Sequence, residues 1–126
     1  MPNYQGVIIE ESLVDKNIMQ KLEILSTKVE QVVDKHKTPW LKQWTLYTVE
    51  IPEGEADKKA EELSQNLDYS HGAWYADFKN DRYHYIIFHS KVFLIDRWSQ
   101  EQYNEAKQYG ISLGIPDYQV DFKAKV

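Results

Sequence analysis

Hydrophobic and polar residues alternate with a period of two along much of the chain up to Ile51. This period is typical of strands, because successive side chains point to opposite faces of a sheet. It predicts three strands, at Gly6–Glu10, Leu22–Val33 and Trp40–Ile51. We expect the second strand to be half-buried with a bulge near Leu25-Ser26, and the first two strands to form an N-terminal β-hairpin.

A helical period replaces the alternation after Pro52. Apolar residues recur there at intervals of four, three and four, which places them on one face of a helix. These residues are Ala56, Ala60, Leu63 and Leu67. Acidic residues precede them, at the end of the helix dipole that favours negative charge. This segment is therefore the clearest helix in the sequence.

Three short strands follow, at Trp74–Lys79, Tyr83–Phe88 and Val92–Arg97. Two-residue breaks at Asn80-Asp81 and Ser90-Lys91 separate them. Breaks of this length between strands predict two tight hairpins.

The last part of the chain predicts a second helix and a final strand. Ser99 and Gln102, three residues later, form a capping-box pattern that opens a helix. Its inner face would carry Tyr103, Ala106 and Tyr109 or Gly110. Apolar and polar residues then alternate over Tyr118–Phe122, and this alternation predicts a closing strand.

These elements predict one α+β domain over residues 1–126, because no repeat, low-complexity tract or linker divides the chain. A mainly antiparallel sheet covered by two helices fits their order, since each helix needs a sheet face for its apolar stripe. From about Trp40 the order contains the ferredoxin-like βαββαβ arrangement, with an extra strand and the N-terminal β-hairpin. That fold hosts many unrelated functions, so it does not decide the function.

Composition excludes several kinds of chemistry. The 126 residues include no cysteine, which excludes disulfides, thiolate nucleophiles, cysteine-ligated zinc and iron–sulfur clusters. None of the four histidines forms an i, i+4 pair on a helix, so we expect no metal and no cofactor. The absence of a signal-peptide pattern and of a long apolar run predicts a cytoplasmic protein that does not enter a membrane. A net charge of −5 disfavours nucleic acid as a partner.

Three runs of the chain resemble a group of small uncharacterised bacterial and archaeal proteins. They are Thr38–Thr45, Trp74–Asn80 and Tyr109–Tyr118, and the likeness covers nearly the whole length. The resemblance implies a stand-alone protein. It implies no activity, ligand or functional residue.

The hairpin from Trp74 to Phe88 carries the most suggestive pair of residues. A two-residue turn at Asn80-Asp81 would place Asp77 directly opposite His84. A carboxylate beside an imidazole orients the ring and raises its pKa, as a general base or acid requires near neutral pH. A structural or surface pair is the commoner role of two such residues, and a one-residue slip in register would separate them.

A catalytic role would use further side chains near this pair. Tyr75 and Lys79 share a strand face with Asp77, and Arg97 ends the third short strand. Each of them would be able to polarise a substrate. The protein would then be a small enzyme for proton transfer or hydrolysis, in which Asp77 orients His84 as the base.

Aromatic residues form a second candidate feature. The chain has four Trp and nine Tyr, and such residues give a large contact area at low entropy cost. They suit a groove or an oligomer interface, and plain core packing is the alternative. The candidate ligand-binding residues are His36, Trp40, Trp44, His71, Trp74, Tyr75, Lys79 and Arg97.

Cationic and aromatic residues also mix around Pro39. Lys35, Lys37 and Lys42 would bind phosphates by charge, while Trp40 would stack on a base or sugar. A solvated loop that its Trp residues anchor to the core is the commoner interpretation, and the net charge of the chain opposes RNA binding.

Three functions stay open on the sequence alone, and it does not decide whether the protein is an enzyme. The leading one is a non-enzymatic binding domain with an aromatic-lined groove for a small molecule or a protein partner, which includes a homodimer through an open sheet edge. The alternative is the small enzyme that uses Asp77 and His84. The third is an RNA or phosphate-ligand binder that uses the 35–44 loop.

Overall fold

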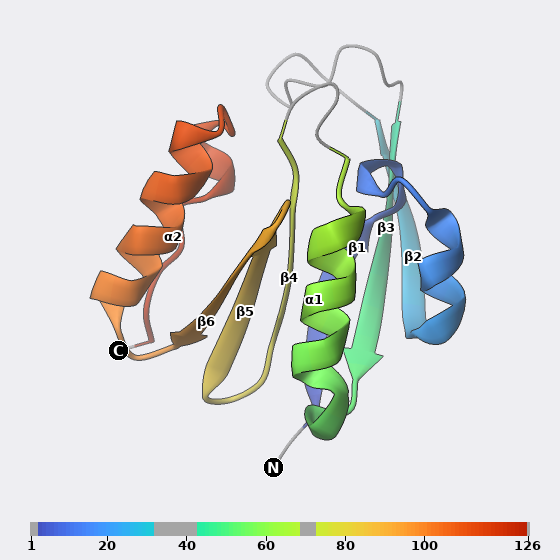
Figure 1. Cartoon of the computed structure of the whole chain (residues 1–126), viewed down its shortest axis with the longest axis horizontal. Coiled ribbons are helices and arrows are strands. Elements are labelled where there is room, and N and C mark those ends of the chain that lie inside the picture. Colours follow the sequence, from blue (N-terminus) through green and yellow to red (C-terminus); the bar gives the residue numbers. More distant parts are fainter. Residues whose placement is uncertain (1–2, 32–42, 69–72, 126) are drawn as a thin grey trace.

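The strands of this protein form a six-stranded antiparallel sheet in the order β2-β3-β1-β4-β5-β6 (Figure 1). The structure is a computed structural model that describes residues 3–31, 43–68 and 73–125. The strands are β1 (Tyr4–Ile9), β2 (Glu23–Gln31), β3 (Gln43–Ile51), β4 (Tyr75–Lys79), β5 (Tyr83–Phe88) and β6 (Lys91–Asp96). The helices are α1 (Ala56–Asn66) and α2 (Gln100–Ser112), with 3-10 turns η1 (Glu10–Ser12), η2 (Lys16–Lys21), η4 (Glu53–Glu55) and η5 (Asp117–Gln119). Both helices of the described chain are too short or too polar to cross a membrane.

Helices α1 and α2 pack on opposite faces of the sheet. Because side chains alternate along a strand, Tyr85 and Ile87 of β5 join the core beneath α1, whereas Ile86 and Phe88 join the core beneath α2. Strand β5 is therefore buried on both faces and links the two hydrophobic clusters. Figure 1 shows α1 over the centre of the sheet and α2 beyond β6.

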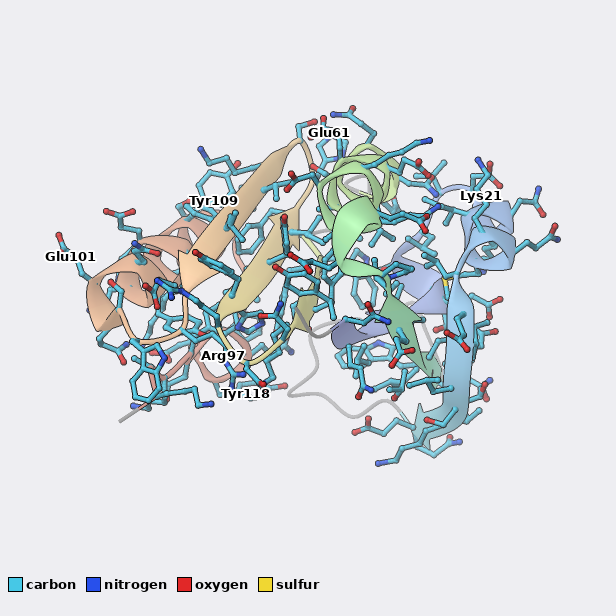
Figure 2. The ribbon with its side chains drawn as sticks, turned by 90° about the horizontal axis from the view of Figure 1, so that it is seen from below. Lys21, Glu61, Arg97, Glu101, Tyr109 and Tyr118 are labelled. Carbon is cyan, nitrogen blue, oxygen red and sulfur yellow. The ribbon has the colours of Figure 1, made fainter. Side chains whose placement is uncertain are left out.

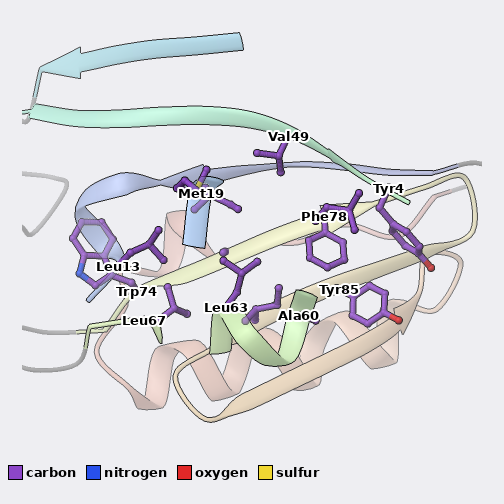
Figure 3. Packing of buried hydrophobic residues seen from close by; sticks show 14 of the residues in the cluster. Tyr4, Leu13, Met19, Val49, Ala60, Leu63, Leu67, Trp74, Phe78 and Tyr85 are labelled. Carbon is purple, nitrogen blue, oxygen red and sulfur yellow. The ribbon is translucent and has the colours of Figure 1, made fainter. Parts of the chain in front are cut away.

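The core beneath α1 forms as the sequence predicts. Ala56, Ala60 and Leu63 lie on the buried face of the helix, and the buried Leu67 follows directly after it. These side chains join the same cluster as Phe78 from β4 (Figure 3). The predicted helix and the face that it buries are therefore confirmed.

Helix α2 begins at the predicted cap and leaves part of its sheet face open. The Ser99 hydroxyl accepts a hydrogen bond of 3.2 Å from the Gln102 amide. The buried face of the helix consists of Tyr103, Ala106 and Gly110. Among the described residues, the cluster beneath α2 contains members of β5 and β6 but none of β1, β2 or β3. Within residues 3–31, 43–68 and 73–125, neither helix therefore lies over the half of this face that β1 and β3 form, and Val7 of β1 is 37% exposed there.

The predicted N-terminal β-hairpin is wrong. Strand β1 lies between β3 and β4, and β2 pairs with β3 instead. The connection from β1 to β2 is tied to the end of α1, which accounts for the difference. The Val14 amide donates to the Asn66 carbonyl (2.8 Å), and the Asp68 amide donates to the Ser12 carbonyl (2.7 Å). The chain then places β2 on the outer side of β3.

Strand β2 forms one edge of the sheet. It is exposed along most of its length and is not half-buried as predicted. The predicted bulge is confirmed by a shift in register between Ile24 and Ser26. A bulge and a charged residue such as Lys28 are typical of sheet edges, where they discourage pairing with another chain.

The hairpin of β5 and β6 turns one residue earlier than predicted. Phe88 pairs with Lys91, so His89 and Ser90 form the turn in place of Ser90 and Lys91. Ser90 has a φ of 58°, in the left-handed region that tight hairpin turns use. Its amide donates to the Ser64 carbonyl of α1 (3.2 Å), and this contact with the helix supports the earlier turn.

The closing strand predicted over Tyr118–Phe122 is also wrong. Pro116 caps the 3-10 turn η5, and the described chain beyond that turn joins no strand of the sheet. The Val120 amide donates to the Asp117 carbonyl (3.1 Å), which closes the turn. The ferredoxin-like βαββαβ order is therefore not confirmed, whereas an α+β fold with an antiparallel sheet and two helices is.

Candidate functional site

The hairpin of β4 and β5 has a different register from the predicted one. Lys79 pairs with His84, and Asp77 pairs with Ile86, so Asp77 is not directly opposite His84. The difference is a shift of two residues, and a shift of two keeps every side chain on its own face. Asp77 and His84 therefore still share a face of the sheet.

Asn80 fixes this register. Its side-chain oxygen accepts hydrogen bonds from the amides of Arg82 (2.9 Å) and Tyr83 (2.8 Å). Its own amide donates to the Tyr83 carbonyl (3.0 Å). Asn side chains commonly close turns by bonding to the backbone in this way. The turn residues are therefore Asp81 and Arg82, where the sequence predicts Asn80 and Asp81.

Asp77, His84 and Tyr103 form one hydrogen-bonded chain. His84 Nε2 lies 2.6 Å from Asp77 Oδ2, and His84 Nδ1 lies 3.0 Å from the Tyr103 hydroxyl. At the far end, the Arg97 guanidinium donates to the Asn80 carbonyl at 2.5 Å, and its positive charge acts to lower the pKa of the nearby Tyr103. Strands β4 and β5, helix α2 and the turn after β6 each contribute one side chain to this network.

The Asp77 end of the network fixes one of its donors. A carboxylate has only acceptors, so the His84 Nε2–H group donates to Asp77 Oδ2. On the other side of the ring, His84 Nδ1 and the Tyr103 hydroxyl share the second hydrogen bond.

This geometry favours the reverse of the roles that the sequence suggests for Asp77 and His84. Both ring nitrogens of His84 are engaged, and its side chain is 6% exposed. The Asp77 side chain is 27% exposed, and its Oδ1 atom accepts no hydrogen bond from the described residues. Asp77 is therefore the group that is able to meet a ligand, and His84 holds it in position.

The segment after α2 forms a wall beside these residues. The Tyr75 hydroxyl donates a hydrogen bond of 2.6 Å to the Gln119 carbonyl. Burial raises the pKa of Tyr75, and the nearby Asp77 carboxylate adds to the rise, so the hydroxyl keeps its proton for this bond. The Phe122 ring meets the rings of Tyr75 and His84 edge-on, with centroids 5.6 and 6.2 Å apart. These contacts fix the segment against β4 and β5.

A largely apolar pocket lies on the half of the sheet face that has no helix over it. Its volume is about 350 Å³. Trp44 and Trp74 meet edge to face in its lining, with ring centroids 5.5 Å apart and planes at 63°. The other described residues that line it are Val7, Ile9, Leu46, Ala73, Tyr75, Asp77, Ile115, Tyr118 and Gln119.

A polar pocket of about 280 Å³ adjoins the apolar one. Its described lining residues include His84, Lys79, Arg97, Tyr103 and Lys123. Four residues line both pockets, namely Tyr75, Asp77, Tyr118 and Gln119. The two pockets therefore adjoin each other, and we call them together the sheet cleft, with Asp77 among the residues between its apolar and polar parts. Figure 2 labels Arg97 and Tyr118, which lie on this side of the sheet.

The sheet cleft brings together most of the candidate site residues. Those that line it are Asp77, His84, Trp44, Trp74, Tyr75, Lys79 and Arg97. His36, Trp40 and His71 lie outside the described residues. The cationic residues of the candidate phosphate-binding loop, Lys35, Lys37 and Lys42, also lie outside them, so that hypothesis stays a prediction.

Sequence reasoning missed the wall and the floor of the sheet cleft. The sequence predicts Tyr103 only as a packing residue of α2 and Tyr118 only as part of a strand. A hydroxyl on the buried face of a helix needs a hydrogen-bond partner, and this rule was the available signal for Tyr103. Val7 and Leu46 carry no such signal, because periodicity does not tell which half of a face the helices leave open.

A second concavity lies between η2 and α1. Its volume is about 630 Å³, and its described lining mixes acidic, basic and amide side chains, such as Glu61, Lys58 and Gln65. None of the candidate site residues lines it. In the described part of the chain, no three His, Asp or Glu side chains gather as a metal site requires.

Comparison of the chain with protein-family models, with curated proteins and with solved structures finds no match. No residue role therefore comes from a relative.

We expect Tyr103→Phe to lower the free energy of unfolding by about 1–3 kcal/mol, because His84 Nδ1 then lies buried without its hydrogen-bond partner. Burial raises the pKa of Tyr103, which Arg97 only partly offsets, so the hydroxyl keeps its proton at neutral pH. Urea unfolding of the variant measures the loss. Tyr109→Phe on the same helix is the matched control, and equal losses in the two variants would contradict the proposed network.

Proposed function

We propose that this protein is a non-enzymatic binding domain whose sheet cleft takes a small molecule with an apolar body and a polar group. The observation that carries the proposal is the meeting of the apolar and polar pockets at Asp77. Sites for small molecules are commonly concave and mostly apolar, with a few polar groups that fix orientation. The sheet cleft likewise has an apolar part and a polar part, with Asp77 among the residues that line both.

The size of the sheet cleft supports a small ligand. Its apolar part has a volume of about 350 Å³, near the lower end of the range of roughly 300–1,000 Å³ for ligand pockets. Trp44 and Trp74 contribute part of its apolar lining, although most of each side chain is buried. The partly exposed Val7 on the floor would be covered by a ligand, which gives its exposure a reason.

The hydrogen-bonded network supports binding more than catalysis. A general base needs a free lone pair within reach of the proton that it takes. His84 has both nitrogens engaged, and it is nearly buried. Such a network holds the Asp77 carboxylate in one orientation, as recognition of a ligand requires.

A fragment screen observed by two-dimensional NMR tests the proposal. We expect small aromatic fragments to shift the indole signals of Trp44 and Trp74 and the amide signal of Asp77. Val7→Arg should abolish these shifts, because it places a long side chain over the floor of the sheet cleft. Val29→Arg makes the same change on the exposed strand β2, where Val29 is 51% exposed, and should leave the shifts intact.

Two results of this screen would contradict the proposed binding domain. One is a library in which no fragment shifts the signals of the sheet cleft. The other is a set of shifts that Val7→Arg and Val29→Arg change alike, since binding would then lie elsewhere.

A second candidate is a small enzyme for proton transfer or hydrolysis, which the 2.6 Å contact of Asp77 and His84 favours. Asp77 would take the proton in this case, and His84 would orient the carboxylate. Turnover of a nitrophenyl ester that Asp77→Asn abolishes and Glu23→Gln preserves would support it. Turnover that both variants retain would rule out this role for Asp77.

The homodimer suggested by an open sheet edge stays a prediction. Strand β2 presents such an edge, with Ile24, Leu25 and Val29 exposed on it. The bulge within β2 opposes pairing there. Sedimentation equilibrium tests the dimer directly, and a monomer at high protein concentration would exclude it.

A further inference from the structure

We infer that the sheet cleft takes an organic cation, a molecule with a flat apolar body and an amine whose N–H group donates to Asp77. This inference rests on the proposed binding function and names the chemical class of its ligand. It depends on where charge lies in the sheet cleft and on which hydrogen-bonding groups there are already engaged.

The apolar part of the sheet cleft has a single negative charge among its described lining residues. Among the described residues that line it, Asp77 is the only one with a charged side chain. The others are aliphatic or aromatic, apart from Gln119. An ionised group beside apolar surface is poorly solvated and interacts strongly with an opposite charge. The apolar part therefore favours a ligand that carries a positive charge near Asp77.

The hydrogen-bonding capacity of Asp77 is the second observation. A carboxylate only accepts hydrogen bonds, and the His84 Nε2–H group fills one position on Oδ2. The neighbouring Tyr75 hydroxyl is no donor to a ligand, because it donates to the Gln119 carbonyl. The one charged group among the described residues of the apolar part is thus an acceptor with room for more donors. A ligand with N–H donors matches it, whereas a carboxylate ligand does not.

The two tryptophans are the third observation. Trp44 and Trp74 are almost buried, and their rings meet edge to face in the lining of the apolar part. They belong to the apolar lining, so they favour an apolar body for the ligand rather than a second charged group. The net charge of −5 also favours the approach of a cation to this protein.

The positively charged residues of the polar part would instead favour an anionic ligand. Arg97 already donates to the Asn80 carbonyl at 2.5 Å. Lys79 lies on the same face of β4 as Asp77, two residues further on, and is exposed. Neither residue lines the apolar part among the described residues. An anionic group bound to them would leave the Asp77 carboxylate between it and the apolar body.

Three probes that share a phenyl body and differ in their polar group test the inference. They are 2-phenylethylamine, 2-phenylethanol and 3-phenylpropionate, titrated into the wild-type chain at neutral pH while the Trp44 and Trp74 signals are followed by NMR. We expect the amine to bind about tenfold more tightly than the alcohol or better, as a charge-assisted hydrogen bond provides. We expect the propionate to bind most weakly.

Variants identify the group responsible. Asp77→Asn should weaken binding of the amine about tenfold or more and leave binding of the alcohol unchanged, since the amide keeps an oxygen that accepts from His84. Glu23→Gln removes the same charge from the exposed strand β2 and should change neither affinity. The comparison of the three probes on the wild-type chain does not depend on the folding of any variant.

The outcomes separate this inference from the proposed function. Equal affinities for the amine and the alcohol would overturn the organic cation and leave a binding cleft. Tightest binding of the propionate would overturn it in favour of an anion held by Lys79 and Arg97. An amine preference that survives in Asp77→Asn would also overturn it. If none of the probes or library fragments shifts the tryptophan signals, the proposed function fails as well.

Discussion

Gly6→Ala should lower the free energy of unfolding by about 3 kcal/mol or more, as forced overpacking in a well-packed interior does. Gly6 lies on β1 opposite Phe78 of β4. A Cβ atom at this position would lie 1.9 Å from the Asp77 carbonyl oxygen and 2.5 Å from the Phe78 Cα atom. Both atoms belong to the backbone, so no rotation of a side chain relieves the clash, and β1 has to move away from β4.

Urea denaturation followed by circular dichroism measures this loss. Gly54→Ala is the matched control, because a Cβ atom at Gly54 meets no described atom within 4 Å. We expect its effect to stay within about 0.5 kcal/mol, as for most surface substitutions. Gly6→Ala with the stability of Gly54→Ala would show that β1 and β4 do not approach as closely as described. Because the clash includes the Asp77 backbone, the variant should also weaken ligand binding in the sheet cleft.

Phe88→Ala should cost about 3–5 kcal/mol, which is the usual range for removing a fully buried Phe side chain. Phe88 is 0% exposed in the cluster beneath α2. Its ring centroid lies 5.1 Å from that of Tyr109 on α2 and 5.9 Å from that of Phe93 on β6. It also lies 6.0 Å from Tyr75, so the loss should extend to the strand that carries Asp77.

The control for Phe88→Ala is Leu94→Ala on the neighbouring strand β6, where Leu94 is half-exposed. We expect it to change the free energy of unfolding by less than about 1 kcal/mol, because little apolar surface returns to water. The midpoints of thermal or urea unfolding compare the two variants. A loss below about 2 kcal/mol for Phe88→Ala would contradict the burial of this ring between β5 and α2.

The helices were predictable from the sequence because their signals are local. The spacing of Ala56, Ala60 and Leu63 identifies the buried face of α1, and the Ser99 cap marks the start of α2. The bulge of β2 and the strands themselves also follow from short stretches of residues. Each of these signals comes from one turn or one strand, so it does not depend on how distant parts of the chain pair or pack.

The order of the strands was not predictable in the same way. Strand β1 pairs with β3 and β4, which follow it by roughly 40 and 70 residues, and no local pattern specifies such partners. The alternation over Tyr118–Phe122 is that of a strand, but among the described residues this segment pairs with neither edge strand, β2 or β6. The turn at η5 and the tether to Tyr75 hold these residues as the wall of the sheet cleft instead.

The sequence predicted which face of the sheet carries the candidate site, but not which residues of β4 and β5 pair with each other. Period-two alternation placed Asp77 and His84 on one face, and the shift of two residues that Asn80 imposes leaves that relation intact. The roles within the pair were not predictable, because they depend on Tyr103 from α2. A hydrogen bond from a distant helix occupies the nitrogen that a catalytic His84 would need.

Along β4, side chains at even positions pack in the core and side chains at odd positions face the sheet cleft. Ala76 and Phe78 are buried beneath α1, whereas Tyr75, Asp77 and Lys79 line the sheet cleft. The chemistry at position 77 or 79 is thus able to diverge among descendants of this sequence while the even positions keep the fold. An insertion of one residue in β4 would exchange the two sets at once. We therefore expect natural variation in this strand to consist of substitutions at odd positions rather than changes in its length.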